Sequence, residues 1–534
     1  MPRPAFRCLR CLIVAALGLG VARPSATQVP TRGGPPVDEA ALPATPLGRL
    51  AGAFVAAVNA GDSTAIARFV AAHVDGGVHG TDAAARTRTL VTLRAQSGGL
   101  DVVHVEPPQD AGDALQVFAA ARDTARVGRR LLGLAFEPTP GDTGRLADVA
   151  LHAMDPAFMR GPQVWAAGPL GDDRLAAVVR ARVRQAADSD RFSGVVLVAH
   201  GGRVLVHEAV GWADRARRVP NTTATRFQTT SVGKMFTGVA VAQLVRAGRL
   251  RLDDALARVL PGYPNADAAR RTTVRQLLTH TAGVPEPFLS PRYAVAPDTA
   301  SHAALLATFA DAPPTMTPGA HHAYSNGNYA TLAAVVERAS GLPYEAYLRR
   351  SVWGPAGMRH VAHPAWSDAP DLAVPYARFT TRDPLGMEPR TAAEPPARVA
   401  RPALRGFGGG AYTAEDLFRF ARALRTGRLL GAAFTDSVVA GEVETGQGPP
   451  GAVRYGLGVY DQQRDGVRVV GHPGSNPDTG WDADVELVWD RDWTVVVLSN
   501  YDAPAGLALS GPIVRLIAHE LWAAAAPTRH APRP

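Results

Sequence analysis

Lysine and cysteine are almost absent from this sequence. Of its 534 residues, 56 are Lys or Arg, yet the one lysine is Lys234, and the two cysteines are Cys8 and Cys11. Because both cysteines lie in an N-terminal segment that we expect to be removed, the mature chain should contain no disulfide, no cysteine nucleophile and no Cys-ligated metal. Long hydrophobic runs are also lacking, so we expect no transmembrane segment once that leader is gone.

The first 26 residues (1–26) have the pattern of a secretory signal peptide. Three arginines, the last of them Arg10, precede an apolar run at 12–21, and small residues follow. We therefore expect a periplasmic or secreted protein. Removing the four arginines of the leader lowers the formal net charge from +8 to about +4. A balance this weak over a large chain indicates no nucleic-acid partner.

Composition and periodicity divide the rest of the chain into two folded units. We expect a flexible tether at 27–46, a small α+β domain at 47–155, a linker at 156–174, a larger domain at 175–525 and a disordered tail at 526–534. In the small domain three helical patterns precede four strand-like runs, an order typical of α+β folds. Strands at both ends of the larger domain flank a helix-rich middle. This arrangement predicts one antiparallel sheet assembled from the two ends.

The element order of the small domain resembles the ketosteroid-isomerase-like cone fold. The resemblance is one of pattern and includes no diagnostic motif. Residues 27–200 contain no tyrosine, so the oxyanion chemistry of that isomerase is not expected here. An accessory role is the simpler interpretation of this domain.

The single lysine stands three residues after a serine, in Ser231-Val232-Gly233-Lys234. If a helix starts here, the two side chains lie on one face, and the lysine Nζ can reach the serine Oγ. A desolvated lysine can lose its proton near neutral pH and act as a base, which arginine cannot do. Backbone N–H groups at a helix start can also stabilise an oxyanion. Taken alone, the pair equally fits an exposed serine beside a surface lysine.

Two further motifs favour a catalytic site. Tyr324-Ser325-Asn326 precedes a helical run, and its phenol and amide can exchange a proton and bind a substrate carbonyl, respectively. His472-Pro473-Gly474 follows a strand-like run, and we expect its imidazole to face the same cleft from the strand edge.

The ordered set S-x-x-K, Y-x-N and H-x-G resembles the serine β-lactamase/penicillin-binding superfamily, in particular its class C-like branch with esterases and D-aminopeptidases. Segments 276–283 and 408–416 resemble the family's LLTHTSG and Gly-Gly…T-x-x-D segments. The resemblance covers about residues 175–525. It implies an α+β protein: a β-lactamase-like antiparallel sheet flanked by helices, with an all-helical subdomain, preceded by the small cone-like α+β domain.

The resemblance also implies roles for individual residues. Ser231 would be the acylated nucleophile, and Lys234 and Tyr324 would share general-base and general-acid work, in either order. Asn326, His472 and Gly474 would contact the substrate. Backbone N–H groups of Ser231 and Ser475 would form the oxyanion hole.

One departure from the family pattern bears on the substrate. The third motif reads His-Pro-Gly where class C β-lactamases have Lys-Thr-Gly. An imidazole is only partly charged at neutral pH, and Pro473 supplies neither a hydroxyl nor a backbone N–H. We therefore expect a secreted serine hydrolase acting on small esters, D-amino-acid peptides or amides, or cell-wall fragments, with weak or absent β-lactamase activity.

Other functions are less consistent with the sequence. It contains no G-x-S-x-G motif of α/β-hydrolases, and its histidine pairs lack the arrangement of zinc sites, so no metal and no cofactor is implied. The alternative from a different class is a non-catalytic ligand-binding or scaffold protein of the penicillin-binding fold. A third possibility keeps the enzyme and assigns specificity to the N-terminal domain through docking to cell wall or a partner.

Overall fold

The computed structural model describes most of both expected domains. The described residues are 41–74, 83–106, 115–127, 130–139, 142–154, 165–166, 170–294, 296, 301–361, 371–378, 384–385, 391–392, 406–447, 451–476 and 480–525. The expected signal peptide and tail, most of the tether and much of the linker lie outside these residues.

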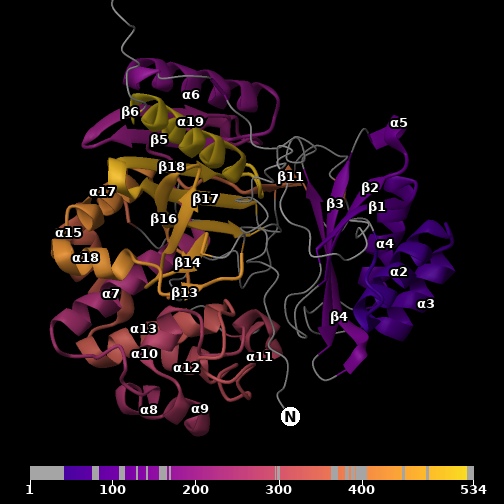
Figure 1. Ribbon diagram of the computed structural model, residues 1–534, viewed down its shortest axis with the longest axis horizontal. Helices are drawn as coiled ribbons and strands as arrows, with labels where there is room; N and C mark the ends of the chain where they lie inside the picture. Colours follow the sequence, from indigo (N-terminus) through magenta and orange to yellow (C-terminus); the bar gives the residue numbers. More distant parts are fainter. Residues whose placement is uncertain are drawn as a thin grey trace, which may run out of the picture.

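The N-terminal unit places three helices before a four-stranded antiparallel sheet of order β1-β2-β3-β4. Its elements are α2 (Pro46–Asn59), α3 (Ser63–His73), α4 (Ala83–Ser97), β1 (Leu100–Glu106), β2 (Leu115–Ala121), α5 (Thr124–Val127), β3 (Leu131–Thr139) and β4 (Asp142–Met154). Side chains of Thr45 and Asp62 accept backbone N–H bonds at the starts of α2 and α3, so local capping sets where these helices begin. In Figure 1 the helices cover one face of the strands. The cone-like resemblance itself stays a prediction.

The core of this unit contains a residue from far along the chain. Phe54 of α2 packs edge-to-face on Phe69 and Phe136, with ring centroids 5.6 and 5.3 Å away. Leu385, which follows the larger unit's main helical segment, is fully buried in the same cluster. Its backbone N–H donates to the Gln96 Oε1 atom at 3.1 Å. The two units are therefore joined by a side chain of the second that completes the core of the first.

The larger unit is built on an eight-stranded sheet of order β13-β14-β15-β16-β17-β18-β5-β6, with every neighbouring pair antiparallel. The strands are β5 (Gly194–His200), β6 (Arg203–Val210), β13 (Val443–Glu444), β14 (Val453–Tyr455), β15 (Tyr460–Arg464), β16 (Val467–Asn476), β17 (Trp481–Val488) and β18 (Trp493–Ser499). Pairing of β18 with β5 joins the two ends of the domain, which confirms the expectation of one sheet assembled from both ends.

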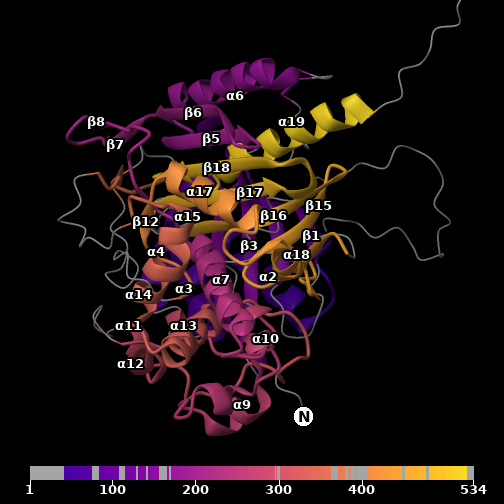
Figure 2. The ribbon, with the colours of Figure 1, turned by 90° about the vertical axis from the view of Figure 1, so that its left-hand side faces the viewer.

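Both faces of this sheet are covered by helices. On β5, Leu197 faces one core and its neighbours Val196 and Val198 face the other, because successive strand side chains point to opposite faces. Helices α6 (Gly171–Asp188) and α19 (Leu507–Ala525) cover one face, whereas α7 (Gly233–Arg246) and α13 (Asn326–Ser340) lie on the opposite side (Figures 1 and 2).

The middle of the chain forms the expected helical subdomain. Besides α7 and α13 it contains α8 (Leu256–Val259), α9 (Ala266–Arg271), α10 (Val274–Leu278), α11 (Pro291–Ala294), α12 (His302–Leu306), α14 (Tyr344–Leu348) and α15 (Gly354–Ala356), followed by α17 (Ala414–Arg425) and α18 (Ala432–Val439). Short strand pairs lie at its borders: β7 (Trp212–Asp214) with β8 (Val219–Pro220), β9 (Phe227–Gln228) with β12 (Ala411–Tyr412), and β10 (Tyr376–Ala377) with β11 (Thr391–Ala392).

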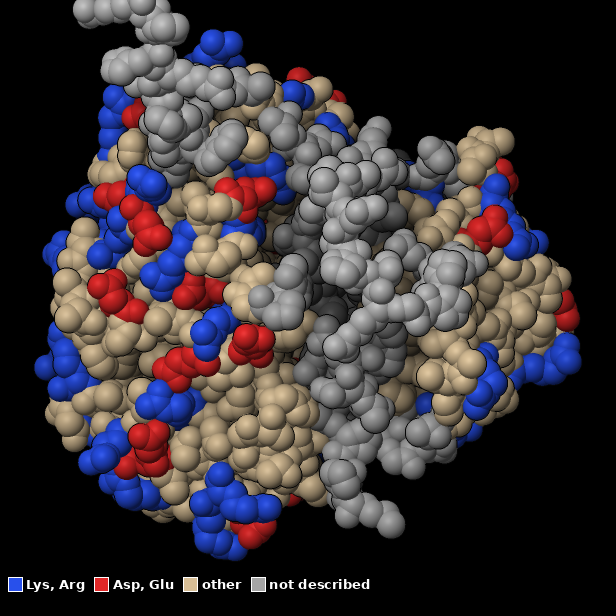
Figure 3. Space-filling model, viewed as in Figure 1, with Lys and Arg blue, Asp and Glu red and all other residues tan. Residues whose placement is uncertain are grey.

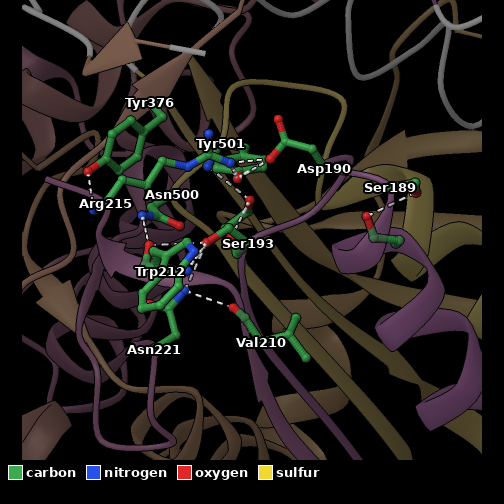
Figure 4. Close-up of polar contacts among 12 residues, drawn as sticks. Ser189, Asp190, Ser193, Val210, Trp212, Arg215, Asn221, Tyr376, Asn500 and Tyr501 are labelled. Atoms are coloured by element: carbon green, nitrogen blue, oxygen red, sulfur yellow. Dashed lines mark hydrogen bonds and ion pairs between the residues drawn. The ribbon is translucent and has the colours of Figure 1, made fainter. Parts of the chain in front are cut away.

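A buried polar cluster fastens the sheet where the two ends of the domain meet (Figure 4). The Asn500 Nδ2 atom donates to the carbonyl oxygens of Trp212 and Val374 at 2.9 and 2.7 Å. Asn221 donates from its own amide to the Ser193 Oγ atom at 3.0 Å. Such side-chain bonds satisfy backbone groups that leave the regular ladder. The cluster has a structural explanation and needs no ligand.

The described surface carries charges of both signs. In the view of Figure 3, Arg residues are interspersed with Asp and Glu over the larger unit. No helix among the described residues is long and apolar enough to cross a membrane.

The buried position of Leu385 predicts that it stabilises the N-terminal unit. We expect Leu385→Ala to lower the free energy of unfolding of that unit by about 2–5 kcal/mol, the usual cost of a core Leu→Ala change. Urea unfolding followed by amide hydrogen exchange in β2 and β3 measures this. The matched control is Val204→Ala, at a side chain that is 41% exposed. Equal losses in the two variants would show that Leu385 contributes nothing specific to the N-terminal core.

Candidate active site

Ser231 lies in a tight turn that leads into α7. The 3-10 turn Thr230–Val232 precedes the helix, which begins at Gly233. Thr230 has a φ of 44°, a left-handed conformation that costs energy for a residue with a branched side chain. The sequence analysis placed this serine at the helix start, and the structure places it on the turn just before, where the backbone is held under strain.

The side chain of Lys234 is completely buried and touches three oxygen acceptors. Its Nζ atom lies 3.1 Å from the Ser231 Oγ atom, 2.8 Å from the Asn326 Oδ1 atom and 2.7 Å from the Phe407 carbonyl oxygen. The Nζ atom also lies 4.7 Å from the centre of the Tyr324 ring. The spacing of Ser231 and Lys234 therefore produces a direct contact inside the protein, and the surface interpretation of the pair is wrong.

Tyr324 approaches the same serine from the other side. Its hydroxyl donates to the Ser231 Oγ atom at 3.0 Å. The ring stacks on the imidazole of His280 with centroids 4.2 Å apart. Tyr324 is held between this histidine and the lysine, so the hydroxyl is directed at the serine oxygen.

Asn326 is the first residue of α13, and its amide connects Lys234 to a carboxylate that the sequence analysis missed. Glu286 accepts the Asn326 backbone N–H at 2.9 Å and the Asn326 side-chain Nδ2 group at 3.2 Å. The signal in the sequence was position: Glu286 lies three residues after the end of the LLTHTSG-like segment. A glutamate in a loop is usually exposed, whereas this one is 6% exposed.

His472 lies beside the site on β16 but is buried. Its Nδ1 lies 2.6 Å from the Pro473 carbonyl oxygen, so Nδ1 carries the proton and donates. The Nε2 atom, 3.0 Å away from the Tyr455 hydroxyl, must then accept. Burial, with a smaller effect of the nearby Lys234 charge, lowers the pKa of His472 to about 3. The expectation of a partly charged imidazole is corrected: the ring is neutral, and both nitrogens are engaged within the protein.

Two glycines, one on β16 and one in the loop before β12, let the backbone approach the Ser231 turn closely. A Cβ atom at Gly474 would lie 2.1 Å from the Thr229 carbonyl oxygen, and one at Gly408 would lie 2.4 Å from that of Thr230. The pairing of β15 with β16 ends at Gly471. Strand β16 continues beyond this residue through Ser475, and β15 does not cover that part of its edge. This edge and the Ser231 turn form two sides of the site.

Three buried hydroxyl groups at this junction have no hydrogen-bond partner among the described residues, namely those of Thr229, Thr230 and Ser475. Buried polar groups are normally paired. These three oxygen atoms are enclosed where β16 packs closely against the Ser231 turn.

The other family-like segments support the site from outside. In the first, the His280 Nδ1 atom accepts from the Ser325 backbone N–H at 3.2 Å, which fixes the turn before Asn326. Burial and nearby positive groups lower the pKa of His280 well below its ordinary value. In the second, buried Asp416 accepts the backbone N–H of Arg359 at 2.7 Å. These residues shape the scaffold.

The described residues contain no group of three or more His, Cys, Asp or Glu side chains that could hold a metal ion. The side chains that meet at the Ser231 Oγ atom are those of Lys234 and Tyr324.

Comparison with known proteins identifies the family of the larger unit. The family model described as Beta-lactamase matches residues 179–520, well over half of the chain. The chain therefore belongs to the Beta-lactamase family, within the serine β-lactamase/penicillin-binding superfamily, and the α+β fold expected from the motifs is confirmed. Membership identifies it as a hydrolase-family protein.

Relatives of several kinds share this domain. "Penicillin-binding protein 4*" of Bacillus subtilis (strain 168) is 28% identical over 327 residues, which are 59% of this chain and 69% of that protein. "Penicillin-binding protein 4" of Amycolatopsis lactamdurans is 32% identical over 289 residues, covering 51% of this chain and 72% of the relative.

Two solved structures extend the comparison to hydrolases. "EstCE1, a hydrolase with promiscuous acyltransferase activity" is 26% identical with a TM-score of 0.54 and covers 66% of this chain and 100% of its own. A D-stereospecific amidohydrolase from Streptomyces sp. is 26% identical with a TM-score of 0.51, covering 64% of this chain and 97% of that one.

The low pKa of His472 predicts that the fold loses stability in acid. An unfolded histidine binds a proton near pH 6.5, whereas His472 in the fold does so near pH 3. Its contribution is complete above about pH 6.5 and is lost toward pH 3, by about 1.4 kcal/mol per pH unit. We expect His472→Gln to reduce this slope, measured as urea midpoints between those pH values. The control is His360→Gln, at an exposed histidine. If the dependence of stability on pH falls no more in His472→Gln than in this control, the low pKa of His472 is contradicted.

Proposed function

We propose that the protein is a serine hydrolase that works through an acyl-enzyme on Ser231. The observation that carries the proposal is the position of the Ser231 Oγ atom, 3.1 Å from the Lys234 Nζ atom and 3.0 Å from the Tyr324 hydroxyl. A nucleophile within hydrogen-bond reach of both a base and an acid is the arrangement that covalent catalysis requires.

The hydrogen-bond partners of Lys234 suit a neutral amine acting as the base. A neutral amine has two N–H donors and one lone pair. The Asn326 Oδ1 atom and the Phe407 carbonyl oxygen accept the two N–H bonds, and the lone pair then faces Ser231. Tyr324 donates to the serine oxygen. Serine can therefore pass its proton to the lysine as its oxygen attacks.

Acylation then proceeds with balanced proton transfers. The Ser231 Oγ–carbon bond forms as the serine proton moves to the Lys234 Nζ atom. The carbonyl oxygen becomes an oxyanion, which we assign to the backbone N–H groups of Ser231 and Ser475. Collapse breaks the bond to the leaving alcohol or amine, which takes a proton from Tyr324, and the Lys234 ammonium returns a proton to the phenolate. Water, or an acceptor alcohol or amine, releases the acyl group by the same steps in reverse.

We propose esters and D-amino-acid peptides or amides as substrates. Two proteins of similar fold support this choice: EstCE1 is a hydrolase with promiscuous acyltransferase activity, and the Streptomyces protein is a D-stereospecific amidohydrolase. His472 supplies no positive charge, since its ring is neutral and enclosed, so we assign it to positioning Tyr455 rather than to binding a substrate carboxylate. Gly474 allows close approach, whereas the Asn326 amide is engaged by Lys234 and Glu286, so we assign it to orienting the base rather than to binding the substrate carbonyl.

Burial of Lys234 argues against the non-catalytic alternative. Placing a lysine in a fully enclosed site costs several kcal/mol unless the group is well paired, and a scaffold gains nothing from that cost. Following the predicted leader, we propose that the protein acts in the periplasm or outside the cell, on small molecules or cell-wall fragments.

Labelling by a fluorophosphonate tests the nucleophile. We expect the intact mass of the wild type to increase by one adduct and that of Ser231→Ala to stay unchanged, because an activated serine attacks phosphorus as it does a carbonyl. The matched control is Ser325→Ala, which removes a hydroxyl close to the site that donates to the Pro285 carbonyl oxygen at 3.3 Å. A folded wild type without an adduct would favour the binding-protein alternative.

The neutral His472 predicts poor turnover of β-lactams. We expect kcat/KM for a chromogenic cephalosporin to be lower than that for p-nitrophenyl butyrate by roughly 10- to 100-fold, the value of one missing charge-assisted hydrogen bond. Steady-state kinetics with both substrates on one preparation measures the ratio. Comparable kcat/KM values would contradict the assignment of His472.

A further inference from the structure

Glu286 is a buried carboxylate at the catalytic cluster, and its hydrogen-bond donors, on Asn326 and Phe288, are neutral groups. Its oxygens accept the backbone N–H and the side-chain Nδ2 group of Asn326 at 2.9 to 3.2 Å, and more weakly the Phe288 N–H at 3.4 Å. Enclosing a carboxylate among neutral donors is costly. A shorter, neutral side chain would avoid that cost, so the charge needs an explanation.

The first consequence concerns the orientation of the Asn326 amide. An ionised carboxylate accepts hydrogen bonds and donates none. Because Glu286 faces the amide, the Nδ2 group must point toward it and the Oδ1 atom must point away. The Oδ1 atom then lies 2.8 Å from the Lys234 Nζ atom. Glu286 therefore decides which end of the amide the lysine meets.

The second consequence concerns charge. The Asn326 amide stands between the Lys234 nitrogen and the Glu286 carboxylate, so its dipole is aligned between a positive and a negative group. A negative charge on the far side of one amide group favours the protonated form of the lysine, because the enclosed surroundings screen the attraction weakly.

The other titratable groups around the lysine do not supply this charge. Tyr324 lies in the segment before α13, and Tyr329 lies in α13 itself. His280 follows α10, His472 lies on β16, and Tyr455 lies on β14 next to His472. Burial raises the pKa of Tyr455 well above its ordinary value, and it leaves both histidines neutral. Among these described neighbours, Glu286 is the group that brings a negative charge.

We propose that Glu286 is a positioning residue for the acyl-transfer reaction: it fixes the orientation of Asn326 and sets the pH at which Lys234 becomes a neutral base. The inference rests on the proposed function of Ser231 and Lys234. It adds that the Glu286 carboxylate stabilises the ammonium formed when Lys234 takes the serine proton. The same stabilisation keeps Lys234 protonated at low pH, where it cannot act as a base, and this sets the lower pH limit of activity.

The test is the pH dependence of Ser231 labelling in Glu286→Gln and Glu286→Asp. We measure the rate constant of fluorophosphonate labelling between about pH 5 and 9, and kcat and KM with p-nitrophenyl butyrate. In Glu286→Gln we expect the acid limb to move to lower pH by about one unit, because the ammonium has lost its stabilising charge. We also expect kcat to fall roughly 10-fold with little change in KM, because the amide can now flip.

Glu286→Asp keeps the carboxylate charge but places it farther from the Asn326 amide, because the aspartate side chain is one methylene group shorter. We expect its acid limb to stay near that of the wild type while kcat falls. The matched control is Asp416→Asn, which removes another buried carboxylate that accepts backbone N–H groups. It should lower thermal stability and leave the limb in place.

The outcomes separate this inference from the function it rests on. If the wild type takes up no label, the proposed function itself fails. If the wild type is labelled and the acid limbs of wild type and Glu286→Gln coincide, the function stands and the role of Glu286 is overturned. A shift of the limb in Asp416→Asn equal to that in Glu286→Gln would also overturn it, because the effect would then follow from general destabilisation.

Discussion

The enclosure of the Lys234 nitrogen by three oxygen atoms is the constraint on which the site depends. Its acceptors come from three separate parts of the chain: the Ser231 turn before α7, Asn326 at the start of α13, and Phe407 in the loop before β12. Each must be held within hydrogen-bond distance for a buried amine to be tolerated. Gly408 and Gly474 help to keep the Ser231 turn within hydrogen-bond distance of the lysine, because a Cβ atom at either position would push the turn away.

The surroundings of the lysine are arranged so that few other charges compete with it. His280 and His472 are neutral because they are buried next to a positive group. Each uses a ring-nitrogen lone pair to accept a hydrogen bond, from the Ser325 backbone N–H in one case and from the Tyr455 hydroxyl in the other. Histidines that look like candidate acids and bases in the sequence therefore act as neutral acceptors that orient other groups.

The sequence predicted the motifs and the order of helices and strands, because these depend on local pattern: α13 is the helical run expected after Tyr324-Ser325-Asn326. It did not indicate the buried carboxylates of β17. There, Asp482 and Asp484 alternate with apolar residues, but they face α19 rather than water, where they bond Gly506 N–H and Ser510. Burial raises the pKa of Asp482 to about 7. Glu286 and Leu385 were missed for the same reason, since their partners lie far away in sequence.

The single lysine in an arginine-rich chain follows from this geometry. Arginine is accepted even where it is mostly enclosed: the side chain of Arg464 is 15% exposed and is paired with Glu486 on β17. A guanidinium is planar, carries five donors and keeps its proton at any physiological pH. The Lys234 site offers three acceptors around one nitrogen, one of them a serine that must give up a proton. Only an amine meets both requirements, because it fits three acceptors when charged and two acceptors plus the serine when neutral. The residue that composition singled out is thus the one whose chemistry arginine cannot reproduce.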